Sequence, residues 1–114
     1  MHEASIALSL LEKVIEECIN NGCSIIKSVK IEIGRASGVM PDALSFVFNA
    51  IKADTIASSA SLYINEKMLT AMCNKCHKEF STEENYIFEC PHCNSNSFNI
   101  LSGKELNIIE LEVE

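Results

Sequence analysis

Four cysteines in two closely spaced pairs are the residues with the clearest chemical purpose in this sequence. Cys73 and Cys76 form one C-x-x-C pair, Cys90 and Cys93 form the other, and thirteen residues separate them. Each C-x-x-C turn points two sulfurs at one centre, and two turns complete the tetrahedron that Zn(II) prefers. Because a site closed by four thiolates leaves no open position, we expect one structural zinc ion here and no catalysis.

Three other kinds of site share parts of this spacing. His77 after the first pair matches covalent haem attachment, but the second pair and the missing export signal count against it. Rubredoxin-like iron sites usually carry glycine after each pair, whereas His77 and Asn94 stand there. A nucleic-acid-binding ribbon should be basic, yet residues 69–103 hold two lysines against four glutamates. Zinc remains the favoured occupant.

The remaining histidines and cysteines have weaker signals. His77 and His92 are expected to be exposed residues of the two turns, with a secondary metal contact as the alternative. Cys18 falls on the apolar face of a predicted helix and is interpreted as a small buried hydrophobe. Cys23 is interpreted as a free thiol without an assigned role.

The first three residues, Met1, His2 and Glu3, offer a second kind of metal site. The Met1 amine, the His2 amide nitrogen and the His2 Nδ1 can close adjacent chelate rings. The Glu3 amide nitrogen or its carboxylate supplies a fourth donor, and nitrogen-rich square-planar sites suit Ni(II) and Cu(II). Because the first N–H groups of a helix have no intrahelical acceptor, binding metal there breaks no helical hydrogen bond.

Hydrophobic periodicity predicts the elements that carry these residues. Helices are expected over residues 3–21 and 41–56, and strands over 26–34, 62–68 and the segment after 103. The alternation of the last strand changes parity at Ile108 and Ile109, which predicts a bulge or burial on both faces there. We therefore expect an α+β fold. Residues 1–68 and 104–114 form a small three-stranded sheet with two helices, and residues 69–103 form an inserted four-cysteine zinc-ribbon module.

Charge and hydrophobicity disfavour two classes of partner, nucleic acid and membranes. The chain has 114 residues and a net charge of −7, which disfavours binding to nucleic acid. No run of apolar residues is long enough to span a membrane, and the N-terminus lacks the pattern of a secretory signal. We expect a cytoplasmic protein without a membrane partner, in which paired cysteines bind metal rather than form disulfides.

Taken together, these motifs resemble the HypA family of nickel metallochaperones. The resemblance rests on Met1-His2-Glu3 opening an amphipathic helix, a strand ending in Gly34, and two C-x-x-C pairs before a last strand. It implies a non-enzymatic carrier of Ni(II) that serves [NiFe]-hydrogenase maturation and, in some bacteria, urease maturation. The alternative interpretation is a nucleic-acid-binding or regulatory zinc ribbon.

The resemblance also implies roles for particular residues and partners. His2 is the essential nickel ligand, and Met1 and Glu3 assist it. The zinc ligands are Cys73, Cys76, Cys90 and Cys93. The implied partners are the GTPase HypB, the hydrogenase large subunit and, in some bacteria, urease accessory proteins.

Overall fold

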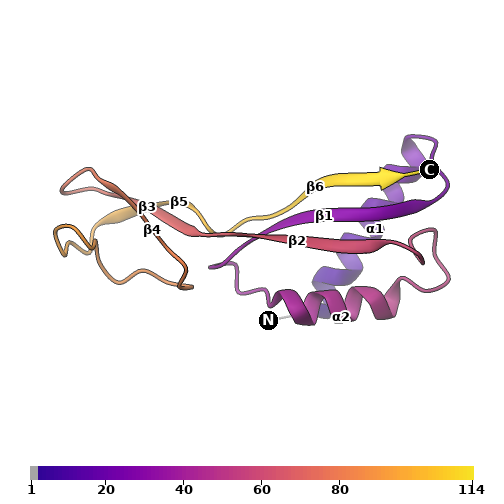
Figure 1. Cartoon of the computed structure of the whole chain (residues 1–114), viewed down its shortest axis with the longest axis horizontal. Helices are drawn as coiled ribbons and strands as arrows, with labels where there is room; N and C mark the ends of the chain where they lie inside the picture. The colour runs from indigo at the N-terminus through magenta and orange to yellow at the C-terminus, as the bar shows by residue number, and fades with distance from the viewer. Residues whose placement is uncertain (1–2) are drawn as a thin grey trace. The chain divides into compact units, whose positions relative to one another are not determined.

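The computed structural model describes residues 3–114, which form two helices and six strands (Figure 1). In chain order these are α1 (Glu3–Asn20), β1 (Ile26–Gly34), α2 (Pro41–Ile51), β2 (Ser61–Lys67), β3 (Leu69–Cys73), β4 (Glu79–Thr82), β5 (Phe98–Ser102) and β6 (Leu106–Val113). The strands form two three-stranded sheets, ordered β2-β1-β6 and β4-β3-β5. The predicted α+β class, a three-stranded sheet with two helices and a four-cysteine module, is confirmed, and the cysteine-bearing part contains a second three-stranded sheet.

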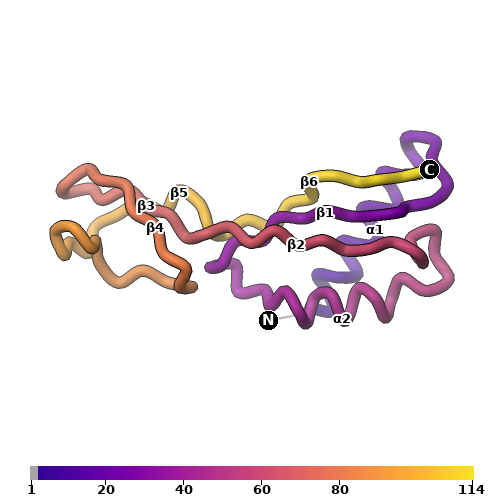
Figure 2. The backbone as a smooth tube through the Cα atoms, in the orientation of Figure 1, coloured from indigo at the N-terminus to yellow at the C-terminus, as the bar shows by residue number. Residues whose placement is uncertain are grey.

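The chain folds as two compact units. The first contains residues 3–31, 39–65 and 107–114, and the second contains residues 32–38 and 66–106. Figure 2 shows the chain passing from β2 directly into β3 and returning through β5 to β6. No helix within residues 3–114 is long and apolar enough to cross a membrane.

The core of the first unit lies between the sheet and the two helices. α1 buries one face, because its apolar residues recur at three- and four-residue steps. α2 contributes Leu44 and Phe48, both fully buried, and β1 contributes Ile26, Val29 and Ile31. In Figure 1, α1 passes behind the strands and α2 runs beside them.

Both helices end earlier than the periodicity predicts. α1 ends at Asn20 because Gly22 adopts a φ of +77° and the Cys23 N–H bonds back to the Cys18 carbonyl at 3.0 Å. α2 ends at Ile51 rather than at residue 56. There the Thr55 hydroxyl donates to the Lys52 carbonyl at 2.6 Å and so competes with the helical backbone bonds.

β3 is the central strand of the second unit. It pairs antiparallel with β4 and with β5, and the register places Ala71 opposite Phe80 and Cys73 opposite Phe98. The register against β5 shifts between Thr70 and Ala71. This arrangement brings the end of β3, which carries the first metal-ligand candidate, beside the start of β5.

β6 does not have the two-sided burial that its change of parity suggested. Ile108 and Leu111 are half-buried, but Ile109 is 48% exposed and Val113 is 41% exposed. The physical reason is that β6 is an edge strand, so its apolar side chains are covered less completely than those of central β1.

Candidate metal centre

The two C-x-x-C turns have closely similar local structures. The N–H groups of Lys75 and Cys76 point at Cys73 Sγ, each at 3.4 Å, and the His92 N–H points at Cys90 Sγ at 3.4 Å. Such N–H groups stabilise negative charge on sulfur. The backbone of each pair is therefore arranged to hold a thiolate.

Each turn is closed by a residue in the left-handed conformation. His77 has a φ of 61° and Asn94 a φ of 63°. Their N–H groups bond to the carbonyls of Cys73 and Cys90, at 3.1 and 2.8 Å. Residues other than glycine are uncommon in this conformation, although asparagine and histidine occur there more often than most. These are the positions at which glycine is common in rubredoxin-like sites.

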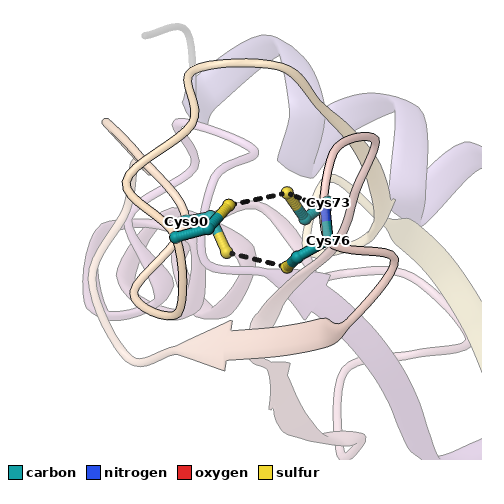
Figure 3. Close-up of side chains that lie close together, drawn as sticks. Cys73, Cys76 and Cys90 are labelled. Atoms are coloured by element: carbon teal, nitrogen blue, oxygen red, sulfur yellow. Dashed lines mark hydrogen bonds between the residues drawn. The ribbon is translucent and has the colours of Figure 1, made fainter.

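The four sulfurs gather at one point, as Figure 3 shows for Cys73, Cys76 and Cys90. All four lie within 4.8 Å of one another, with Cys73 and Cys93 at 3.5 Å and Cys76 and Cys90 at 3.7 Å. Four sulfurs bound tetrahedrally to one zinc ion at about 2.3 Å stand roughly 3.8 Å apart. The observed separations fit such an ion without rearrangement of the backbone.

The cluster forms the centre of a small core. Buried Ala71 and Phe80 pack with the buried sulfurs of Cys73 and Cys90, while the ring of Phe98 stacks on that of Phe80 at 6.0 Å. Few large apolar side chains contribute, so a bound metal ion must supply much of the folding free energy of this part of the chain.

Polar side chains hold the first turn against the strand that follows the second turn. The Asn74 amide donates to Ser97 Oγ at 3.0 Å, and the Asn99 amide donates to Asn74 Oδ1 at 3.1 Å. The Asn74 N–H also bonds to the Ser97 carbonyl. These contacts fix the distance between the two cysteine pairs.

The local structure shifts the pKa values of the Cys73 and Cys76 thiols in opposite directions. The Cys76 N–H is the main cause that lowers the pKa of Cys73 from 9.0 to about 6, against the opposing effect of burial. The Lys78 N–H acts to lower the pKa of Cys76, but burial and contacts with the neighbouring sulfurs outweigh it and raise that pKa to about 11. The backbone N–H groups around Cys73 therefore favour the thiolate form at Cys73 over that at Cys76.

Neither histidine belongs to this cluster. Within residues 3–114, the metal-ligand group contains the four cysteines alone, and both His77 and His92 are exposed. The interpretation of these histidines as exposed turn residues agrees with the structure.

The predicted N-terminal site falls largely outside the described residues, which exclude Met1 and His2. Glu3 is the first residue of α1, and its Oε2 accepts a hydrogen bond from the Met40 N–H at 3.2 Å. Met40 is the N-cap of α2 and has no side-chain cap of its own. The Glu3 carboxylate thus binds the start of α2, where its negative charge is favourable.

The interpretation of Cys23 as a free thiol is wrong. Cys23 is joined to buried Cys18 by a disulfide, with their Cα atoms 5.1 Å apart. The signal in the sequence was the position of the two cysteines on either side of the helix stop at Gly22. A helix that ends in a left-handed glycine turns back on its last turn, which brings these positions together.

A small α+β protein with four cysteine sulfurs clustered at one point belongs to the class of metal-binding proteins. Comparison with known proteins defines the class further. The model of a family described as "Hydrogenase/urease nickel incorporation, metallochaperone, hypA" matches residues 1–113. The chain belongs to the HypA family, whose members are maturation factors and not enzymes.

Individual relatives match along their whole length. The chain is 38% identical to "Hydrogenase maturation factor HypA" of Rhizobium leguminosarum bv. viciae, with 99% of each chain covered. It is 41% identical to the protein of that name from Geotalea uraniireducens, with both chains fully covered. The solution structure of the Ni metallochaperone HypA from Helicobacter pylori has the same fold, with a TM-score of 0.70 and 24% identity over 99% of this chain and 97% of that one.

Proposed function

We propose that this chain binds Ni(II) at its N-terminus and delivers the ion during [NiFe]-hydrogenase maturation. The proposed ligands are Met1 through its amine, His2 through its amide and imidazole nitrogens, and Glu3. The observation that carries the proposal is the match of residues 1–113 to a family of nickel-incorporation proteins. Delivery for urease maturation is a second role that the description of the family suggests.

The contact between Glu3 and Met40 favours one of the two donors that Glu3 offers. Because the carboxylate already accepts the Met40 N–H at 3.2 Å, nickel is better served by the Glu3 amide nitrogen. That amide nitrogen belongs to the first residue of α1 and directly follows His2 in the chain. The carboxylate then acts as a positioning group that holds the start of α1 against the start of α2.

The four cysteines are proposed to hold zinc rather than the transported nickel. Soft thiolates in a tetrahedral arrangement suit Zn(II), whereas Ni(II) favours square-planar nitrogen and oxygen donors. A closed thiolate site also releases its ion slowly, which suits a structural metal and not a cargo. The cargo moves by ligand exchange, in which a partner's ligands displace those of an accessible site.

The partners proposed are the GTPase HypB, the hydrogenase large subunit and urease accessory proteins, in the cytoplasm. We further propose that residues 1–68 and 104–114 act as the nickel-binding domain, with residues 69–103 as the zinc module. Nucleic acid and membranes are not among the proposed partners, because the chain carries a net charge of −7 and the described residues include no membrane-crossing helix.

Nickel titration of the untagged, zinc-loaded chain tests the proposal. One nickel ion per chain should bind to the unaltered protein, and His2→Ala should abolish that binding because it removes the imidazole and disrupts the chelate. A short extension ahead of Met1 should also weaken binding, since it removes the free amine. Equal nickel binding by all three proteins would show that the N-terminal assignment is wrong.

Two controls separate a local effect from a loss of structure. Exposed His92 provides the matched substitution, because His92→Ala removes a histidine beside the thiolate site and should leave nickel binding unchanged. Zinc content, measured on every variant, should stay at one ion per chain. By the Irving–Williams order Cu(II) should bind the same site at least as well as Ni(II).

A further inference from the structure

The segment between β4 and the second cysteine pair exposes two aromatic rings. Phe88 is 77% exposed and Tyr86 is 57% exposed, and their rings meet edge to face with centroids 4.7 Å apart. Ile87, between them, is partly buried and packs on the core around the sulfurs. An exposed pair of aromatic rings provides a large contact area, as is typical of binding surfaces.

These rings border a groove of about 510 Å³ within the second unit. Phe80 and Pro91 supply further apolar wall, and Glu84 and Glu89 supply carboxylates. This volume lies in the range of about 300–1,000 Å³ that is typical of ligand pockets. The groove thus combines apolar contact area with fixed negative charge.

All charged side chains in this segment are acidic. Residues 79–89 contain four glutamates and no lysine, arginine or histidine. The ion pairs found within residues 3–114 involve Glu32, Glu66 and Glu114, so Glu84 and Glu89 stay available to an incoming cation. Arg35 donates to the Glu83 carbonyl and pairs with Glu66.

We propose that this groove binds a basic segment of a partner protein, with arginine side chains between the aromatic rings and the carboxylates. A guanidinium stacks on an aromatic face and forms charge-assisted hydrogen bonds with carboxylate oxygens at the same time. Nucleic acid is repelled by the carboxylates. A second copy of this chain, with a net charge of −7, is repelled in the same way.

The groove shares its wall with the metal centre. Phe80 belongs both to the groove and to the core that encloses Cys73 and Cys90, and Pro91 directly follows Cys90. The groove therefore depends on the bound metal for its shape, and the metal-loaded module presents a docking surface that the metal-free module lacks. This role is independent of nickel binding at the N-terminus.

Fluorescence anisotropy with a labelled peptide tests the proposal directly. The probe is Gly-Arg-Leu-Arg-Phe-Arg-Gly, compared with matched peptides in which glutamine or glutamate replaces each arginine. The zinc-loaded full chain should bind the arginine peptide saturably and the other two at least about tenfold more weakly. Backbone amide chemical shifts should move in residues 80–91. Equal binding of all three peptides would overturn the proposal.

Matched substitutions test whether this groove is the binding site. Phe88→Ala should weaken binding about tenfold or more, whereas Phe46→Ala should not, although Phe46 in α2 is equally exposed at 76%. Glu84→Gln with Glu89→Gln should lower affinity and reduce its salt dependence, and Glu110→Gln with Glu112→Gln should do neither.

Two outcomes of these substitutions would overturn the proposal. Equal losses in the groove variants and their controls would show non-specific attraction to an acidic protein. Self-association in sedimentation that disappears in Phe88→Ala would assign the face to a second copy instead. Zinc content and the amide spectrum of each variant establish that it is folded.

Discussion

Gly34 and Gly103 pack backbone against backbone where the chain passes between its sheets. A Cβ on Gly34 would overlap the carbonyl group of Gly103, and a Cβ on Gly103 would lie 2.7 Å from the Cα of Leu69. The Ala36 N–H bonds to the Gly103 carbonyl at 2.7 Å, and the Gly34 N–H bonds to the Glu105 carbonyl at 2.8 Å. Glycine at the end of β1 therefore allows the backbone at Gly34 to approach the backbone at Gly103 closely.

Gly34→Ala is expected to destabilise the zinc-loaded protein by about 3 kcal/mol or more, because rigid backbone must move to admit the methyl group. Gly22→Ala is the control, since no atom lies within 4 Å of its added Cβ. Only the positive φ of Gly22 opposes that change, at a cost of about 1 kcal/mol. Urea unfolding measures both, and similar losses would contradict the close approach.

Removal of the metal should unfold one part of the chain selectively. Cys90→Ser removes a buried ligand from the small core around Ala71 and Phe80, so the amide signals of residues 66–106 should collapse toward unfolded positions. The signals of α1 and α2 should persist, because their apolar core contains none of the four clustered cysteines. Loss of both sets of signals together would show that the two units fold as one.

Zinc affinity should depend on pH in two regimes. Between about pH 6 and 9 the metal-free Cys76 is protonated, because its pKa is raised to about 11, and zinc must displace that proton. Each displaced proton costs roughly tenfold in affinity per pH unit. Cys73, with its pKa lowered to about 6, is already a thiolate in this range. Protons compete with zinc for the Cys73 sulfur only at lower pH.

The logarithm of zinc affinity should therefore rise with pH throughout, and its slope should steepen below about pH 6. Competition with a zinc chelator at fixed ionic strength measures the slope. A slope that stays constant from pH 5 to 8 would contradict the low pKa of Cys73.

His77→Gly should stabilise the zinc module by about 1 kcal/mol, since glycine adopts the φ of 61° without strain. Metal content should not change, because His77 is exposed and lies outside the cysteine cluster. Thermal unfolding and metal analysis of the same sample supply both results. Loss of metal from this variant would instead give His77 a role in binding.

The sequence predicted the parts of this structure whose causes are local. The alternation of Val29 and Ile31 marks β1, and the spacing of the cysteine pairs defines the metal cluster, because strand pleating and turn geometry act over a few residues. The early end of α2 was missed, since it depends on a hydrogen bond from Thr55 that competes with the helix. The pairing of Cys18 with Cys23 was missed because the expected cytoplasmic location favoured reduced thiols.

Contacts between residues far apart in the chain could not be predicted from the sequence. The contact between Glu3 and Met40 joins residues 37 apart in the chain, and no local sequence pattern predicts it. The groove beside Phe88 is lined in part by Ile87, which also packs on the core around the sulfurs, so its wall depends on residues distant in the chain.

Glu3→Gln should distinguish the two donors that Glu3 offers to nickel. A glutamine side-chain oxygen still accepts the Met40 N–H, so the start of α1 keeps its position. If the amide nitrogen is the ligand, nickel affinity should change by less than about threefold, which is under 1 kcal/mol. A loss of a hundredfold would identify the carboxylate as the ligand. Glu3→Ala, which removes the contact with Met40, should weaken binding more than Glu3→Gln.

X-ray absorption at the nickel and zinc edges of the untagged protein, loaded with one equivalent of each metal, distinguishes the two proposed metal sites. Nickel should be surrounded by nitrogen and oxygen donors without sulfur, and zinc by four sulfurs at about 2.3 Å. In His2→Ala the nickel signal should be lost while the zinc spectrum stays the same. Sulfur scattering at the nickel edge would contradict nickel binding at the N-terminus, because it would place the transported ion in the cysteine cluster.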